Sequence, residues 1–206
     1  LEFYPGNLEM VSISGFFKSF RDPIEQILIA ASGFEPIRSY ANAKAAQNYG
    51  VEFELKKKLD FVAPLLRNFS FVGNLSLIHS QIKVHEVSGF QTAKRPLQGQ
   101  ADYISNFGLY FQKFSGRYTA SLIYNKVGEK ISRVGFANLG DIIELPRDQV
   151  DISASAKLVK HLTIKLAVKD LLNQDLKMMQ RTTTGDKTAE RWKIGRLISF
   201  GLAYSL

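Results

Sequence analysis

The sequence predicts an all-β protein, an antiparallel up-and-down meander of about eight long strands. Apolar and polar residues alternate along most of the chain, which puts the two kinds on opposite faces of extended strands. No stretch of comparable length has helical periodicity. The connections between alternating segments are short and long in turn, as in a row of hairpins with two unequal rims.

Each predicted strand has one apolar and one polar side. In the second, Tyr49, Val51 and Phe53 alternate with Glu52 and Glu54, so its polar face carries charge. Residues 41–48 have a composition that would allow a turn of helix, although they stand between strands. The eight predicted strands lie at about residues 11–17, 49–56, 69–80, 102–112, 118–125, 150–157, 162–169 and 198–206.

The connections separate into two kinds. Long polar connections are the best places for substrate contact, because loops on a rigid scaffold usually carry recognition. The short ones lie near residues 60–67, 113–116 and 159–161, and the long ones near 21–46, 85–98, 134–148 and 172–192.

Composition excludes several classes of function. The 206 residues contain no Cys, so disulfide frameworks and Cys-based metal or thiol chemistry are impossible. A net charge of +8 would suit nucleic acid, but the Lys and Arg are scattered and no recognition helix or RNA-binding strand motif is present. We therefore expect no nucleic-acid partner. No run of about 20 apolar residues predicts a membrane-spanning helix.

A meander with one apolar face can turn that face inward or outward. The polar faces here are mostly Ser, Thr, Asn and Gly, as in a hydrated lumen, and several Tyr lie near strand ends. These features and the strand lengths favour part of a transmembrane β-barrel with the apolar face toward lipid. The alternatives are a stand-alone small outer-membrane barrel and a soluble ligand-binding β-barrel. The soluble barrel requires Phe107, Leu122 and Ile164 to be buried.

Several runs together resemble the C-terminal part of a TonB-dependent outer-membrane receptor. They are YANAKAAQNYGVEFELKKKL, LQGQADYISNFGLYFQ, YTASLIYNKVGEKI, DQVDISASAKLVKHLTIKLAVKDLLNQD and GRLISFGLAYSL, and they cover nearly the whole chain. In the resemblance, the DLLN segment is where the penultimate strand leaves its ladder, and GR opens the last strand. The matching residues are Asn42, Gly50, Val51, Glu52, Tyr124, Asn125, Asp170, Leu171, Leu172, Asn173, Gly195 and Arg196.

The resemblance implies a 22-stranded barrel in the bacterial outer membrane that takes up a siderophore, vitamin or glycan. Residues 1–206 would be one domain, a C-terminal barrel segment without the plug domain. The implied partners are outer-membrane lipid, the rest of the barrel and its plug, TonB through an absent N-terminal part, and the barrel-assembly machinery. We expect no enzyme activity and no cofactor.

The chain ends on an apolar strand that resembles the family's assembly signal. Family members usually end on Phe, whereas this chain ends on Leu206. The resemblance assigns the signal to Phe200, Leu202, Tyr204 and Leu206.

Individual candidate sites are few. Six charged residues on the predicted polar face of the strands are candidates for contact with a plug or a permeation path. The simpler interpretation is that they are solvated and have no individual roles. The His residues, His79, His85 and His161, lack a third ligand at metal-binding spacing, and no Ser, His and carboxylate set indicates catalysis. The six charges are Glu52, Glu54, Asp151, Lys157, Lys165 and Lys169.

Overall fold

The computed structural model describes residues 1–29, 37–84, 94–135, 139–182 and 185–205. Strands dominate these residues, and they form two sheets of nine and six strands. The one helical element among them is the short 3-10 helix η1 (Pro64–Leu66). No helix within these ranges is both long and apolar enough to cross a membrane.

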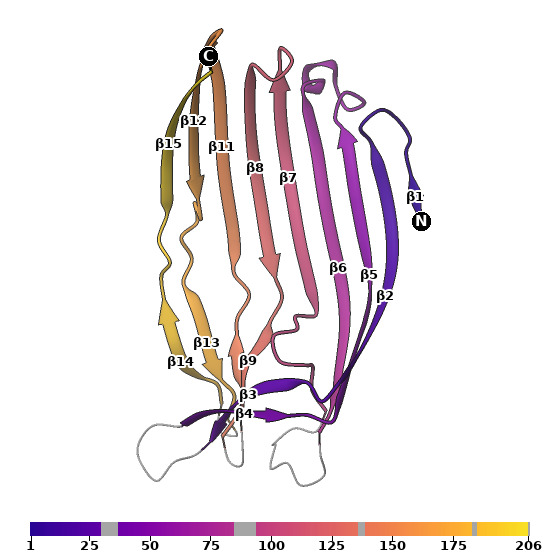
Figure 1. Cartoon of the computed structure of the whole chain (residues 1–206), viewed down its shortest axis with the longest axis vertical. Helices are drawn as coiled ribbons and strands as arrows, with labels where there is room; N and C mark the ends of the chain where they lie inside the picture. The colour runs from indigo at the N-terminus through magenta and orange to yellow at the C-terminus, as the bar shows by residue number, and fades with distance from the viewer. Residues whose placement is uncertain (30–36, 85–93, 136–138, 183–184, 206) are drawn as a thin grey trace.

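The nine-stranded sheet, called the wall below, is antiparallel throughout and confirms the predicted meander. Its eight long strands match the eight predicted segments, with a two-residue strand added at one edge (Figure 1). In spatial order they are β1 (Glu2–Phe3), β2 (Met10–Arg21), β5 (Ala45–Lys58), β6 (Phe69–Lys83), β7 (Tyr103–Lys113), β8 (Tyr118–Val127), β11 (Asp148–Val159), β12 (Leu162–Lys169) and β15 (Leu197–Tyr204).

The two ends of the wall differ in the length of their connections, as the sequence predicted. Tight connections join β5 to β6, β7 to β8 and β11 to β12 at the short-turn end, the top of Figure 1. The connections 22–44, 84–102, 128–147 and 170–196 all lie at the opposite, long-loop end.

The six-stranded sheet was not predicted. Five of its strands lie within three of the four segments interpreted as long polar connections, and β9 begins before the third of them, at Lys130; the sheet lies at the long-loop end (Figure 1). The proposed helical turn at 41–48 is wrong, because these residues end one strand and begin another. The order is β14 (Lys187–Trp192), β13 (Leu176–Gln180), β10 (Ile142–Glu144), β9 (Lys130–Gly135), β3 (Ile24–Ile29) and β4 (Ile37–Asn42).

Register places the predicted apolar residues on one face of the wall. Leu122 on β8 pairs with Leu109 on β7 and Ile152 on β11, so the apolar side chains lie side by side across three strands. On the opposite face, the hydroxyls of Ser121 and Ser153 lie 2.8 Å apart. The wall therefore has an apolar face and an opposite face that is mostly polar, with apolar side chains such as Phe16 and Ile78 among the polar ones.

The apolar face does not enclose a core. Phe107, Leu122 and Phe200 are 37%, 43% and 64% exposed, and Ile164 is half-buried, which contradicts the soluble-barrel alternative. Buried apolar clusters in the described residues gather at the long-loop end instead. Their members are Ile27, Ile131, Val134 and Ile143 in one cluster, Leu28, Ile142 and Met178 in another, and Ala43, Ala46 and Ile82 in a third.

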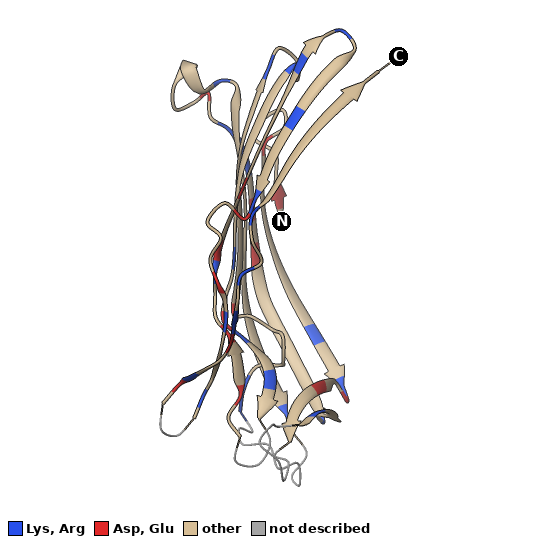
Figure 2. Cartoon of the chain, turned by 90° about the vertical axis from the view of Figure 1, so that its left-hand side faces the viewer, with Lys and Arg blue, Asp and Glu red and all other residues tan. Residues whose placement is uncertain are grey.

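The wall is a single bent layer that does not close on itself (Figure 2). In the described residues, β1 and β15 lie at its two edges, and no pairing joins them. The arrangement is an open section of barrel wall rather than a closed eight-stranded barrel.

Gly50 on β5 occupies a position where the neighbouring strands leave no room for a side chain. A Cβ there would lie 2.2 Å from the carbonyl oxygen of Leu77 and 2.9 Å from the ring of Phe16. Because backbone blocks the space, β6 would have to shift to admit even a methyl group. Gly15 on β2 offers a comparison, since its Cβ would meet nothing closer than 3.8 Å.

We expect Gly50→Ala to lower the free energy of unfolding by about 1–3 kcal/mol, the usual cost of overpacking. Gly15→Ala is the matched control and should change the free energy by less than about 0.5 kcal/mol. Urea unfolding in detergent micelles measures both. Equal effects of the two substitutions would contradict the close packing described at Gly50.

Candidate functional site at the long-loop end

Residues 94–102, between β6 and β7, lie against the polar face of β5 and β6. The backbone N–H of Leu97 donates to Ser80 Oγ at 2.9 Å, and Asn48 Nδ2 donates to Gln100 Oε1 at 2.8 Å. Ser80 Oγ also donates to Asn48 Oδ1 at 2.7 Å. The segment thus covers the polar face at this end, which explains why Asn48 is buried there.

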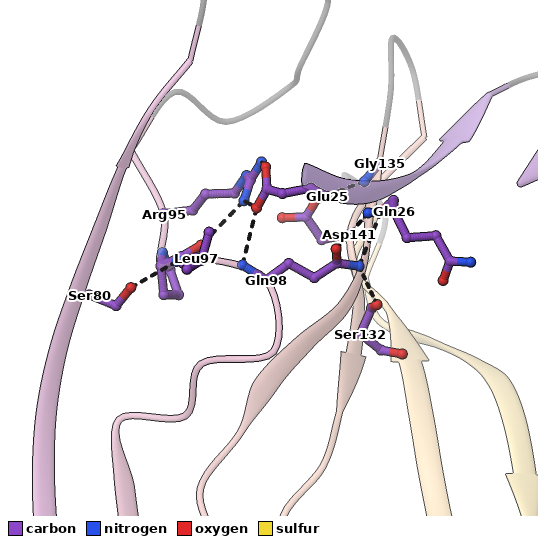
Figure 3. Close-up of polar contacts among 10 residues, drawn as sticks. Glu25, Gln26, Ser80, Arg95, Leu97, Gln98, Ser132, Gly135 and Asp141 are labelled. Atoms are coloured by element: carbon purple, nitrogen blue, oxygen red, sulfur yellow. Dashed lines mark hydrogen bonds and ion pairs between the residues drawn. The ribbon is translucent and has the colours of Figure 1, made fainter. Parts of the chain in front are cut away.

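A buried ion pair joins this segment to the β3–β4 hairpin (Figure 3). Arg95 donates from Nη1 and Nη2 to the two carboxylate oxygens of Glu25, at 2.8 and 2.7 Å. The side chains are 3% and 0% exposed. Two parallel hydrogen bonds fix the geometry of both groups, and each charge depends on the other for compensation.

Gln98 forms the second link between the same elements. Its Oε1 accepts from the backbone N–H of Gln26 at 2.6 Å, and its Nε2 donates to the carbonyls of Gln26 and Ser132 at 3.1 and 2.5 Å (Figure 3). One side-chain amide therefore joins β3 to β9, whose direct parallel pairing is limited to Ile27 with Val134 and Leu28 with Gly135.

These contacts border a cavity of about 530 Å³, a size within the range of small-molecule sites. Its lining mixes charges of both signs, and several of them are already paired. Arg181 contacts Glu129, and Lys130 Nζ lies 3.1 Å from Glu144. Such a lining favours hydrated, polar contents and has no strong preference for one sign of charge.

The six predicted polar-face charges all lie on that face by register, but they do not form one site. Glu52, which accepts from Ser14 and Ser76 at 3.5 and 3.4 Å, is on β5 with Glu54. The carboxylate of Asp151 accepts from the backbone N–H of Asp170 at 2.8 Å. The remaining three are Lys157 on β11 and Lys165 and Lys169 on β12.

The histidines lie apart from one another. His79 stacks against Tyr49 on the apolar face with ring centroids 5.0 Å apart, and His161 Nδ1 lies 2.7 Å from the Ser205 carbonyl at the short-turn end. His85 falls outside the described residues. Within those residues, no three His, Cys, Asp or Glu side chains are grouped so that they could hold a metal ion.

The DLLN and GR motifs adopt the local structure that the resemblance implies. β12 ends at Lys169, and Asp170 and Asn173 follow with φ of 53° and 48°, which break the ladder. Arg196 Nε donates to the Leu171 carbonyl at 2.7 Å, so the start of β15 is tied to this turn.

Other matched residues lie in regular positions. Asn42 Nδ2 donates to the Asp22 carbonyl at 2.8 Å, and Tyr124 Oη donates to Asp148 at 2.6 Å. Three members of the predicted assembly signal, Phe200, Leu202 and Tyr204, share the apolar face of β15. Leu206 lies outside the described residues.

Comparison with known proteins supports the fold. No family model matches the chain, and no curated protein is similar to it in sequence. Solved structures do match, among them a mutant of the ferric enterobactin receptor PfeA from Pseudomonas aeruginosa, with 15% identity and a TM-score of 0.63 over 100% of this chain. The fold is that of a TonB-dependent receptor barrel.

Two further structures agree with this assignment. The copper transporter OprC has 14% identity and a TM-score of 0.67 over 98% of this chain, and the FrpB iron transporter from Neisseria meningitidis has 14% and 0.60 over 98%. The chain spans 28–30% of the length of these three receptors. Its fold therefore matches part of the barrel wall of these proteins.

We expect Glu25→Gln to destabilise the long-loop end by about 3–5 kcal/mol, because it leaves the Arg95 guanidinium buried without its counter-charge. Hydrogen exchange of residues 94–102 measures this locally. The double substitution Glu25→Leu with Arg95→Met should recover much of the lost protection.

The control for the buried pair is the Arg38–Glu190 pair, 3.5 Å apart, in which Arg38 is 60% exposed. Arg38→Gln should cost no more than about 1 kcal/mol. Unchanged exchange in the Glu25→Gln variant would show that the buried pair does not hold the segment.

Proposed function

We propose that this chain forms part of the wall of a bacterial outer-membrane receptor that takes up a scarce nutrient, a siderophore, vitamin or glycan, by TonB-dependent transport. The observation that carries the proposal is the wall itself, with a largely apolar face on one side and, on the other, a mostly polar face that apolar side chains such as Phe16 and Ile78 interrupt. The titles of the matched structures name receptors and transporters of ferric enterobactin, copper and iron, which supports a nutrient of this kind.

The height of the apolar face supports a membrane location. On β5 the residues of the apolar face are apolar from Tyr49 to Leu55, and the next residues on that face, Gln47 and Lys57, are polar. The two polar residues that bound this stretch are ten residue steps apart, so at about 3.4 Å per step and a strand tilt of about 40° the apolar band between them is at most about 26 Å tall. The apolar band of outer-membrane barrels is about 25 Å tall.

The unequal ends set the orientation in this proposal. Outer-membrane barrels have short periplasmic turns and long extracellular loops, so the long-loop end would face the outside of the cell. The segment 94–102 and its cavity would then lie at the outer mouth of the lumen, where a nutrient enters. The polar face would meet the plug domain and the permeation path, and TonB would act through a part of the receptor beyond this single-domain segment.

A soluble alternative and an enzymatic one receive no comparable support. The matched structures are receptors and transporters. The charged cavity and loop strands suit recognition rather than catalysis, and we propose no cofactor.

Single-cysteine labelling tests the proposal, since the chain has no Cys of its own. Ser153→Cys on the polar face should react with a water-soluble, charged thiol reagent in outer membranes. Ile152→Cys, one residue away on the apolar face, should resist that reagent and react with a lipid-soluble one. Equal labelling of both positions by the charged reagent would refute the lipid-facing assignment.

The assembly signal yields a second test. In this proposal the apolar face of β15 is read by the barrel-assembly machinery, so Phe200→Ser should lower the fraction of newly made protein that becomes folded in the outer membrane. Ser199→Ala, on the polar face of the same strand, is the control. Pulse labelling with a gel assay of the folded form measures both, and indistinguishable yields would argue against the signal.

A further inference from the structure

The apolar face of β2, β5 and β6 changes character toward the long-loop end. Register aligns Phe17, Tyr49 and His79 in one row across the three strands. The next row on the same face is Ser19, Gln47 and Gln81, and the one after it is Arg21, Ala45 and Lys83. Along these strands toward the long-loop end, the side chains of this face therefore change from aliphatic to aromatic, then to amide and hydroxyl, and finally to cationic.

The two cations of the last row lie on the outer side of the sheet. The neighbours Phe20 and Ile82 pack in the buried cluster on the opposite face, so Arg21 and Lys83 point the other way. Both are exposed, and they flank Ala45. Two strand spacings of about 4.8 Å put their backbones about 10 Å apart.

Neither cation is neutralised within the described residues, where no ion pair to Arg21 or Lys83 occurs. Asp22 is adjacent in the chain but forms no ion pair with either. Other cations at this end do have partners: Arg95 pairs with Glu25, Lys126 with Asp148 at 2.9 Å, and Arg147 with Asp170 at 2.7 Å. Among the described residues, the outer side of β2 and β6 thus carries two positive charges without an ion pair, with Lys44 exposed beside them.

The spacing suits the layers of a lipid leaflet. The Arg21 row lies four residues beyond the Tyr49 row, about 14 Å along a strand and about 10 Å in height at a tilt of 40°. Aromatic side chains favour the boundary between acyl chains and headgroups, and long basic side chains reach farther toward anionic groups. Cations at this height lie level with headgroup phosphates.

We propose that Arg21 and Lys83 bind phosphate groups of lipid headgroups in the leaflet at the long-loop end. The inference rests on the proposed function, because it requires the apolar face to lie in lipid. The site is open, exposed and continuous with the apolar face. This fits the phosphate group of a lipid, because the acyl chains of the same lipid molecule would lie along that face and keep the phosphate at the membrane surface. A free anion would have only two exposed cations and a cavity of about 30 Å³, which Lys83 lines and Arg21 does not.

The test compares purified protein in detergent with three added probes: lipid A carrying two phosphates, the same lipid without phosphates, and inorganic phosphate. Native mass spectrometry measures the bound lipid. The variant is Arg21→Gln with Lys83→Gln. The control is Lys18→Gln with Lys165→Gln, which removes the same charge from the polar face.

We expect the variant to bind phosphorylated lipid A on the order of 30-fold more weakly, and the control to bind like the unaltered protein. The lipid without phosphates should bind no better to the unaltered protein than to the variant. Equal binding by variant and control, or displacement of the lipid by inorganic phosphate, would overturn the inference. Failure of the cysteine-labelling test would instead refute the membrane location itself, so the two failures are distinguishable.

Discussion

The structure depends on one constraint, that every backbone polar group of a strand in hydrocarbon must be paired with a neighbouring strand. The unbroken ladder from β2 to β15 meets this requirement and fixes the register. Register then decides which side chains lie on the apolar face and which on the polar face, because a slip of one residue would exchange the two faces. Leu122 lies between Leu109 and Ile152 for this reason, and Ser121 reaches Ser153 on the other side.

A different principle organises the long-loop end. There the chain leaves the ladder, and backbone N–H groups of residues 94–102 donate to side chains such as those of Ser80 and Glu25. Burial of the Glu25 and Arg95 charges is tolerated because each neutralises the other through two hydrogen bonds. The loop end is therefore specified by a few polar contacts, whereas the wall is specified by a repeating pattern.

The same division explains what could be predicted from sequence. The long strands were predictable because apolar and polar residues alternate over residues 49–56 of β5 and along most of residues 69–80 of β6. Strand β10 has three residues, too few for a period to appear, and the other five strands of its sheet have only five or six. The partner of Glu25 lies 70 residues away, and nothing local indicates it.

The outer surface and the loop end are coupled through the strands they share. On β6, Ser80 and Ile82 hold the segment 94–102 on the polar face, while His79, Gln81 and Lys83 alternate with them on the opposite face. Strand geometry allows no independent rotation of the two sets, because successive side chains point to opposite faces. A headgroup that orders the end of β6 from outside would therefore also steady the surface on which the segment rests. The position of the segment 94–102 and the placement of the outward-facing side chains of β6 are thus both set by the geometry of this one strand.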